Sequence, residues 1–243
     1  MARAHFYTRK GLLRGDLPNM KIVVVGGHSR NIGKTSVVEG LIRGLSSLDW
    51  TAVKISPYSH AADLLPGEAN VRDRTKPAFL LTEVENSTGP TDTSRFLAAG
   101  ARRALWLRVQ DSHLAEACGR LLDTLQGAGH VIIESNRFVE VVKPSVYLMV
   151  VDRAQPDFKP SAQRLLHRAD ALLLIGSHSH ATGWPVQSAH LLERKPVFPA
   201  RALGEASPDL WEFVWQKLHE PGVGNRFPRL ANLWPAKEQP WRH

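Results

Sequence analysis

The stretch KIVVVGGHSRNIGKTSVVEGLI, residues 21–42, carries the strongest structural signal in the chain. An apolar run over residues 21–26 enters a glycine-bearing turn, and Gly33-Lys34-Thr35 then opens a segment with apolar residues at helical spacing. In this context backbone N–H groups can curl around phosphates, and the helix N-terminus adds its partial positive charge. The stretch therefore predicts a phosphate-binding loop between a buried strand and a helix.

The residue types in the loop suit a nucleotide and a metal ion. Gly33 would let the backbone approach the phosphates, Lys34 would reach the β- and γ-phosphates, and the Thr35 hydroxyl would ligate Mg²⁺. The common spacing G-x4-G-K-[ST] would need glycine at position 28, where the chain has His28, so Gly27 gives the longer form G-x5-G-K-T. The predicted nucleotide-binding residues of the loop are Gly27, His28, Ser29, Arg30, Asn31, Ile32, Gly33, Lys34, Thr35 and Ser36.

Short apolar runs alternate with helical patterns along the rest of the chain. Several of these runs are apolar throughout, as expected for parallel strands covered on both faces. Strand–helix alternation predicts an α/β fold in three layers with a mostly parallel sheet, the P-loop NTPase architecture. The expected strands are 21–26, 51–56, 104–109, 130–134, 146–152, 171–175 and 196–198. The expected helices are 34–48, 93–101, 113–126, 161–168 and 209–219.

The chain reads as one domain with two extensions. Residues 20–220 are expected to form the nucleotide-binding domain, because 243 residues fit one α/β domain better than two. Residues 1–19 are expected to form a basic, disordered arm, and Met20 offers an alternative start directly before the first strand. Residues 221–243 are rich in Pro and Trp and are expected to be an irregular tail. The polar region 57–90 is a functional loop in this interpretation, with a hairpin expected at its apolar part, 78–84.

The amino-acid composition limits the kinds of ligand and partner that the chain is expected to bind. The formal net charge of +8 favours anionic ligands, but the Lys and Arg residues are dispersed, which argues against a nucleic-acid surface. The one cysteine, Cys118, lies in an apolar helical pattern and is expected in the core. No apolar run approaches the roughly 18–20 residues that cross a bilayer. We therefore expect a cytoplasmic chain with no membrane partner, which binds a nucleotide and either an anionic small molecule or a protein; a homodimer is compatible with the sequence.

Two acids are candidates for catalysis and for holding Mg²⁺ together with Thr35. Glu134 closes an apolar strand, and ligands of such sheets bind at the carboxyl ends of the strands. An acid in that place is costly unless it has a partner, although it can also simply face solvent. Asp92 opens a helix, where it serves either as an N-cap or as a ligand of Mg²⁺ or water. Lys34, Glu134 and Asp92 are the predicted catalytic residues.

Two cations are further candidates for binding phosphate or an acidic substrate. Lys54 ends a strand and can either neutralise a phosphate or remain solvated. Arg95 lies one helical turn after Asp92 and can fork to a phosphate or carboxylate, or form an ordinary surface ion pair. A metal site on His178, His180 and His190 is disfavoured, because their spacing is irregular and no cysteine supports them.

Several segments resemble known families. The longer loop is similar to those of dethiobiotin synthetase and the cobyrinic acid a,c-diamide synthases, which belong to a wider group that includes the molybdopterin-guanine dinucleotide biosynthesis protein B (MobB) family. The segments VKISPYSH, TDTSRFLAAGA and HVIIESN resemble MobB segments in the same order, with Ser135 where glycine is expected. The matching positions are Lys54, His60, Asp92, Arg95, Ala99, Gly100, Ala101 and Glu134.

This resemblance implies a Mg²⁺-dependent nucleotide-binding and hydrolysing protein that assists molybdenum-cofactor maturation. Two alternatives stay open: an ATP-dependent ligase or kinase of the dethiobiotin synthetase type, and a regulatory module that holds nucleotide without turnover. The choice between ATP and GTP also stays open. The guanine-reading pattern Asn-Lys-x-Asp is absent after residues 171–175, where the sequence reads Gly-Ser-His-Ser-His, and no motif identifies ATP.

Overall fold

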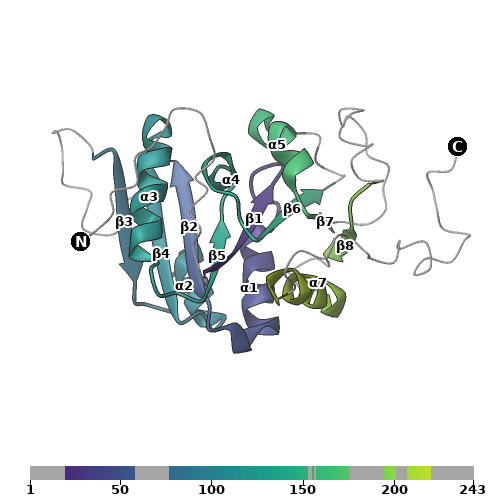
Figure 1. The fold of residues 1–243 in the computed structure, drawn as a ribbon, viewed down its shortest axis with the longest axis horizontal. Helices are drawn as coiled ribbons and strands as arrows, with labels where there is room; N and C mark the ends of the chain where they lie inside the picture. The colour runs from purple at the N-terminus through teal and green to yellow at the C-terminus, as the bar shows by residue number, and fades with distance from the viewer. Residues whose placement is uncertain are drawn as a thin grey trace, which may run out of the picture.

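The computed structural model describes residues 20–57, 77–152, 155, 157–175, 194–200 and 207–219. These residues form one eight-stranded sheet with helices on both faces (Figure 1). The strands are β1 Lys21–Gly27, β2 Thr51–Pro57, β3 Phe79–Val84, β4 Arg103–Val109, β5 His130–Glu134, β6 Val146–Asp152, β7 Ala171–Ile175 and β8 Val197–Ala200. The helices are α1 Lys34–Gly44, α2 Asp92–Ala98, α3 Leu114–Thr124, α4 Phe138–Val141, α5 Pro160–Leu165 and α7 Pro208–His219, with short 3₁₀ turns η1 Ser46–Leu48, η4 Asp111–His113 and η5 Leu166–Arg168.

The strand order places the phosphate loop in the middle of the sheet. The order is β3-β4-β2-β5-β1-β6-β7-β8, and every neighbouring pair is parallel except β3 with β4. β1 therefore lies between β5 and β6, with Val25 opposite both Glu134 and Leu148. Because these strands are parallel, the turn that follows β1 and the acid that ends β5 meet at the same edge.

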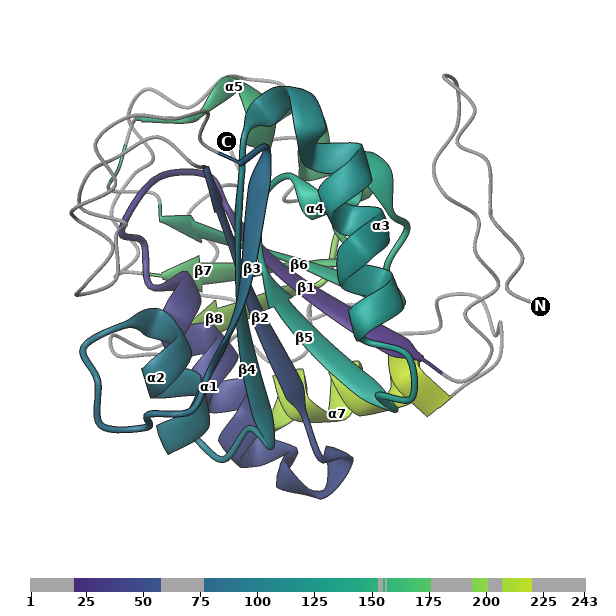
Figure 2. The same ribbon diagram turned by 90° about the vertical axis from the view of Figure 1, so that its left-hand side faces the viewer.

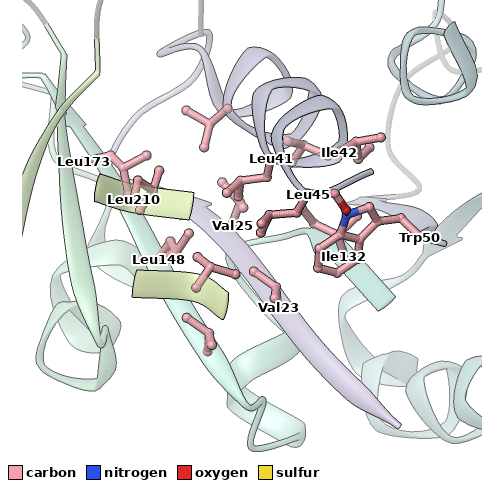
Figure 3. Packing of buried hydrophobic residues seen from close by; sticks show 14 of the residues in the cluster. Val23, Val25, Leu41, Ile42, Leu45, Trp50, Ile132, Leu148, Leu173 and Leu210 are labelled. Atoms are coloured by element: carbon pink, nitrogen blue, oxygen red, sulfur yellow. The ribbon is translucent and has the colours of Figure 1, made fainter. Parts of the chain in front are cut away.

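Two apolar cores lie on the two faces of the sheet. Alternate residues of β1 supply both: Val23 and Val25 pack under α1, α2 and α7, whereas Ile22 and Val24 pack under α3, α4 and α5 (Figure 2). Figure 3 shows the first core, where Leu41 of α1 packs near Val25. Burial on both faces explains why the strands are apolar throughout.

The fold class predicted from the sequence, a three-layer α/β fold with a mostly parallel sheet, is confirmed. The expected strands recur within one or two residues of their predicted ends. The stretch 78–84 does not form a hairpin of its own: β3 pairs antiparallel with β4, across α2. The expected helix 34–48 ends at Gly44 and continues as η1, and α4 was not expected. The remainder of the expected loop, 58–76, and both predicted extensions, 1–19 and 221–243, lie outside the described residues.

Two compositional expectations can be compared with the structure. Cys118 is fully buried in α3, as predicted. Within the described ranges, no helix is both long enough and apolar enough to traverse a bilayer.

Candidate phosphate-binding site

The backbone of the loop between β1 and α1 needs glycine at two positions. Gly33 precedes α1 with φ of 83°, in the left-handed region that favours glycine. Gly27 is required for space, because a Cβ there would lie 2.6 Å from Ile32 Cδ1 and 2.9 Å from Lys34 Cδ. Asn31, the other residue of the turn with positive φ, is exposed at its tip. The loop is therefore closely wound around the Lys34 side chain.

Lys34 folds back over this loop. Its Nζ donates a 3.4 Å hydrogen bond to the Ser29 carbonyl oxygen, at the far side of the turn. Burial lowers the pKa of Lys34, and the nearby Glu134 carboxylate acts in the opposite direction. The amine thus lies over the turn between β1 and α1.

A cluster of oxygens and one amine lies beside the first turn of α1. The Thr35 hydroxyl donates a 2.9 Å hydrogen bond to Glu134 Oε2. Lys54 Nζ lies 2.5 Å from Glu134 Oε1 and 2.7 Å from Asp92 Oδ2. Glu134 is buried, with 2% of its side chain exposed, whereas 36% of the Asp92 side chain is exposed. The structure thus brings together Thr35, Lys54, Asp92 and Glu134 from α1, β2, α2 and β5.

Electrostatics favour the charged forms of Lys54 and Asp92. Burial alone would lower the pKa of Lys54, but the two carboxylates outweigh burial, so its pKa is raised. Burial alone would raise the pKa of Asp92, but Lys54, the Thr35 hydroxyl and Arg95 together lower it. Each group therefore stabilises the charge of its neighbour, which is how a buried acid such as Glu134 is tolerated.

The donor set of this cluster fits Mg²⁺. Mg²⁺ prefers hard oxygen ligands and is commonly held by one or two carboxylates, with phosphates and waters completing its shell. Thr35, Glu134 and Asp92 offer one hydroxyl and two carboxylates within a single hydrogen-bonded group. The Lys54 ammonium lies between the two carboxylates, so the cluster already holds one positive charge.

Arg95 forms the carboxylate fork that its residue type allows, and its partner is Glu39. Its Nε and Nη2 donate to the two Glu39 oxygens at 2.7 and 3.1 Å, and Nη2 also lies 3.3 Å from Ser36 Oγ. Glu39 is a buried acid on the inner side of α1, and the sequence analysis missed it. The fork ties α2 to α1 and so holds Asp92, 3.9 Å from the Arg95 guanidinium, beside the loop.

His28 explains the departure from the common glycine spacing. Its ring is completely buried against Phe158, with ring centroids 5.0 Å apart. The Asp152 N–H donates to Nδ1 at 3.3 Å, and Nε2 lies 3.2 Å from the Gln155 carbonyl oxygen. The His28 carbonyl oxygen accepts the Lys159 N–H. The extra residue of the loop thus anchors it to the segment that follows β6.

Asn136 is a second residue that the sequence analysis missed. Its amide accepts a hydrogen bond from the Gly27 N–H at 2.6 Å and donates one to the Gly27 carbonyl oxygen at 2.7 Å. Ser135, where the MobB pattern has glycine, accepts the N–H groups of Arg137 and Phe138 and supports the start of α4. The segment after β5 therefore fixes the beginning of the loop as well as supplying Glu134.

The remaining predicted positions divide into two groups. Ser29 donates to Asp157 at 3.3 Å, and Arg30 is exposed at the loop tip. The positions 60, 178, 180 and 190, all histidines, lie outside the described residues. Within the part of the chain that the structure describes, no group of three or more His, Cys, Asp or Glu residues could hold a metal ion.

These features define a P-loop NTPase fold. A buried strand leads into a tightly wound glycine loop, a helix begins at Lys34, and an acid lies on the neighbouring parallel strand. No family model and no curated protein matches the chain. Several solved structures are similar to the chain. LpxK from Aquifex aeolicus with ATP has 15% sequence identity and a TM-score of 0.43, over 74% of this chain and 53% of that one, so the chain spans about half the length of LpxK.

Two further solved structures are similar to the chain. HypB from Helicobacter pylori in complex with nickel has 14% identity and a TM-score of 0.45, over 84% of this chain and 91% of that one. The signal recognition particle receptor FtsY from Elizabethkingia anophelis with GDP has 15% identity and a TM-score of 0.42, over 90% of this chain and 67% of that one.

Proposed function

We propose that this chain binds a nucleoside triphosphate with Mg²⁺ and hydrolyses or transfers its γ-phosphoryl group. The observation that supports this most directly is the convergence of Thr35, Glu134, Asp92 and Lys54 beside the Lys34 loop. A purely structural loop has no need for two carboxylates and two lysines at the start of one helix, and burying charges there is costly.

The roles of the side chains follow from their positions. The loop amides and Lys34 bind the phosphates and stabilise charge on the transferred group. Thr35, Glu134 and Asp92 would hold Mg²⁺, which when bound neutralises charge on the phosphates. Lys54 pairs with both acids and helps lower the pKa of Asp92. Asp92, the more exposed of the two acids, would orient a water or an acceptor group.

Only the resemblance to the MobB family supports a particular pathway for this chain. The MobB-like positions Lys54, Asp92, Arg95 and Glu134 favour a supporting role in molybdenum-cofactor maturation. The ligase or kinase alternative gains support from Lys54, a cation between the two acids that can also face an acidic acceptor. Slow hydrolysis that a protein partner changes would favour the first role, whereas ATP consumption coupled to an added metabolite would favour the second.

The deciding experiment measures the affinities for ATP and GTP with Mg²⁺ by calorimetry. Wild type, Lys34→Ala and Lys143→Ala are compared, because Lys143 is exposed and far along the sequence from the loop. We expect micromolar binding of one nucleotide, at least a tenfold loss in Lys34→Ala and no loss in the control. The proposal fails if the wild type binds neither nucleotide or if Lys34→Ala binds as tightly. Nucleotide binding without phosphate release, unchanged in Glu134→Gln and Asp92→Asn, would indicate the regulatory module instead.

A further inference from the structure

The segment 157–159, which lies between β6 and α5, runs along the phosphate loop. Ser29 Oγ donates a 3.3 Å hydrogen bond to Asp157 Oδ2. The Phe158 ring packs against the His28 ring, and the Lys159 N–H donates a 3.0 Å hydrogen bond to the His28 carbonyl oxygen. Because its own backbone is bonded to the loop, the Lys159 ammonium lies within one side-chain length of the loop backbone.

This segment and the Glu134 cluster lie on opposite sides of the loop. β1, which leads into the loop, lies between β5 and β6 in the sheet (Figure 1). Glu134 ends β5, whereas residues 157–159 follow β6. Lys34, at the end of the loop, responds to charges on both sides. Burial is the main cause that lowers its pKa, Glu134 acts in the opposite direction, and the positive charge of Lys159 lowers the pKa further. The charge of Lys159 therefore acts within the loop.

The Lys159 ammonium adds a positive charge for which the described residues offer no ion-pair partner. Burial lowers the pKa of this half-buried group, the Arg30 guanidinium lowers it further, and the Asp157 carboxylate acts in the opposite direction. The contact of Lys159 with the loop uses only its backbone N–H, so the anchoring of the segment does not explain the charged side chain. Lys34, Arg30 and Lys159 together place three cations at one loop, and an anion that binds among them relieves their repulsion.

The two sides of the loop suit different parts of a nucleoside triphosphate. In P-loop NTPases Mg²⁺ bridges the β- and γ-phosphates. The oxygens that could hold Mg²⁺, from Thr35, Asp92 and Glu134, all lie on the β5 side of the loop. A nucleotide that places its γ-phosphate near those oxygens directs its nucleoside end away from them. The α-phosphate, which adjoins the nucleoside, is then the phosphate nearest to Lys159 on the β6 side.

We infer that Lys159 binds the α-phosphate of the nucleotide, with Arg30 as a second cation beside it. This inference rests on the proposed function and deepens it, because it assigns a residue to the part of the nucleotide that does not react. The α-phosphate keeps its charge while the γ-phosphoryl group is transferred. Lys159 therefore stabilises the ground state and the transition state equally, which raises affinity without raising the rate of the chemical step. Lys34, in contrast, acts on the reacting group.

The test compares wild type, Lys159→Met and Lys143→Met as full chains, with the exposed Lys143 as the control position. Calorimetry with Mg²⁺ measures the affinities for ATP, GTP and the matching diphosphates, and the matching monophosphate is used as a competitor. Lys159→Met should weaken all three forms of the preferred nucleotide by about tenfold, which corresponds to the loss of one hydrogen bond to a charged group. In steady-state phosphate release its KM should rise by a similar factor, while kcat stays within about twofold of the wild-type value. Lys143→Met should match the wild type.

Two further variants guard against misfolding. Lys159→Arg retains the positive charge and should recover most of the affinity. Arg30→Gln, at an exposed position, should weaken the same three forms of the nucleotide without a loss in kcat. If circular dichroism shows that Lys159→Met does not fold, Arg30→Gln decides: a loss of affinity for all three forms supports the assignment, and unchanged affinity overturns it.

The outcomes separate this inference from the proposed function. If the wild type binds nucleotide but Lys159→Met binds it as tightly, the α-phosphate assignment is overturned and the proposed function stands. The same conclusion follows if kcat falls while diphosphate affinity is unchanged, because Lys159 then acts on the γ-phosphate. Unchanged competition by the monophosphate also overturns the assignment, because that ligand carries only the α-phosphate. If the wild type binds neither ATP nor GTP, both proposals fail.

Discussion

Thr35 and Glu134 are 99 residues apart in the sequence, yet the threonine hydroxyl donates a 2.9 Å hydrogen bond to the carboxylate. The parallel pairing of β1 with β5 causes this contact, because Val25 and Glu134 occupy the same register position. The strand pairing in the sheet therefore places Glu134 beside the first turn of α1. The chemistry of the site depends on the strand order as much as on the loop.

Replacing Glu134 with Gln should reduce phosphate release on the order of a hundredfold, because a charged Mg²⁺ ligand becomes neutral at nearly constant size. The loss in turnover should exceed the loss in nucleotide affinity, since Lys34 and the loop amides remain. Glu83→Gln, an exposed acid paired to Arg103, is the matched control. Steady-state phosphate release at saturating Mg²⁺ and nucleotide measures the effect. Equal rates for wild type and Glu134→Gln would remove Glu134 from the catalytic machinery.

Replacing Lys54 with Met should destabilise the fold by about 3 kcal/mol, the lower end of the range for breaking a buried ion pair, since 20% of the Lys54 side chain is exposed. The double variant Lys54→Met/Glu134→Gln should recover part of the loss. Because the folded pKa of Lys54 is raised, its contribution is complete below the unfolded value of about 10.4 and is lost as the pH rises through the folded pKa.

Urea unfolding at several pH values tests this prediction. The difference in unfolding free energy between wild type and Lys54→Met should stay constant from pH 7 to 9 and shrink above about pH 10.4. A difference that grows in that alkaline range would contradict the assignment of the raised pKa to the ion pairs.

Replacing Gly27 with Ala should lower nucleotide affinity at least tenfold. The added Cβ would lie 2.6 Å from Ile32 Cδ1 and 2.9 Å from Lys34 Cδ, so it would push the lysine from its place over the loop. Gly129→Ala is the matched control, because nothing lies within 4 Å of a Cβ there. Calorimetric titration of both variants with the preferred nucleotide measures the effect. Unaltered affinity in Gly27→Ala would mean that the loop relaxes without cost.

The Cys118 thiol should resist alkylation until the chain unfolds. Burial raises its pKa to about 12, and the thiolate is the reactive form. Iodoacetamide at pH 8 should therefore label the protein at a rate that follows the population of unfolded chain as urea is added. Mass spectrometry of quenched samples gives that rate. Fast labelling while the circular dichroism spectrum stays native would show a local opening of α3 instead.

The sequence was sufficient for the fold because its signals are local. Apolar runs over residues such as 130–134 and the glycine turn before Lys34 specify strand, loop and helix without reference to distant residues. The placement of Glu134 beside Thr35 could also be anticipated, since the carboxyl ends of parallel strands share one edge. Residues 78–84 and 104–109 were both expected to be extended, but the pairing of β3 with β4 was not predicted, because pairing across an intervening helix leaves no local pattern.

The interactions that fix the site could not be predicted in the same way. Glu39 occupies an inner position of an amphipathic helix, where an acid is unusual, and this is the one sequence signal that could have found it; nothing local identifies its partner Arg95. Asn136 is one polar residue among several after β5, and only the structure shows it holding both backbone groups of Gly27. His28 departs from the motif, but its partners lie more than 120 residues away.

Wild-type stability should fall on mild acidification because of His28. Burial lowers the pKa of the ring, while the carbonyl oxygens around it and the acids Asp152 and Asp157 act in the opposite direction. In the neutral ring, Nδ1 accepts the Asp152 N–H and the proton lies on Nε2, facing the Gln155 oxygen. Protonation of Nδ1 removes that acceptor. The folded chain therefore disfavours the charged ring.

The sign of the pH effect follows from this preference. Below the unfolded pKa of about 6.5, the unfolded chain binds a proton on this histidine, whereas the folded chain does not. The contribution of the neutral ring to stability is therefore complete above that pH and decreases as the pH falls towards the lowered folded pKa. His28→Gln should show a flatter profile than the wild type between about pH 6.5 and 5, whereas His167→Gln, an exposed residue, should keep the wild-type slope. Because His130 also has a lowered pKa, the difference between profiles isolates His28. Urea unfolding across that window provides the measurement, and parallel profiles for wild type and His28→Gln would show that the ring titrates equally in both states.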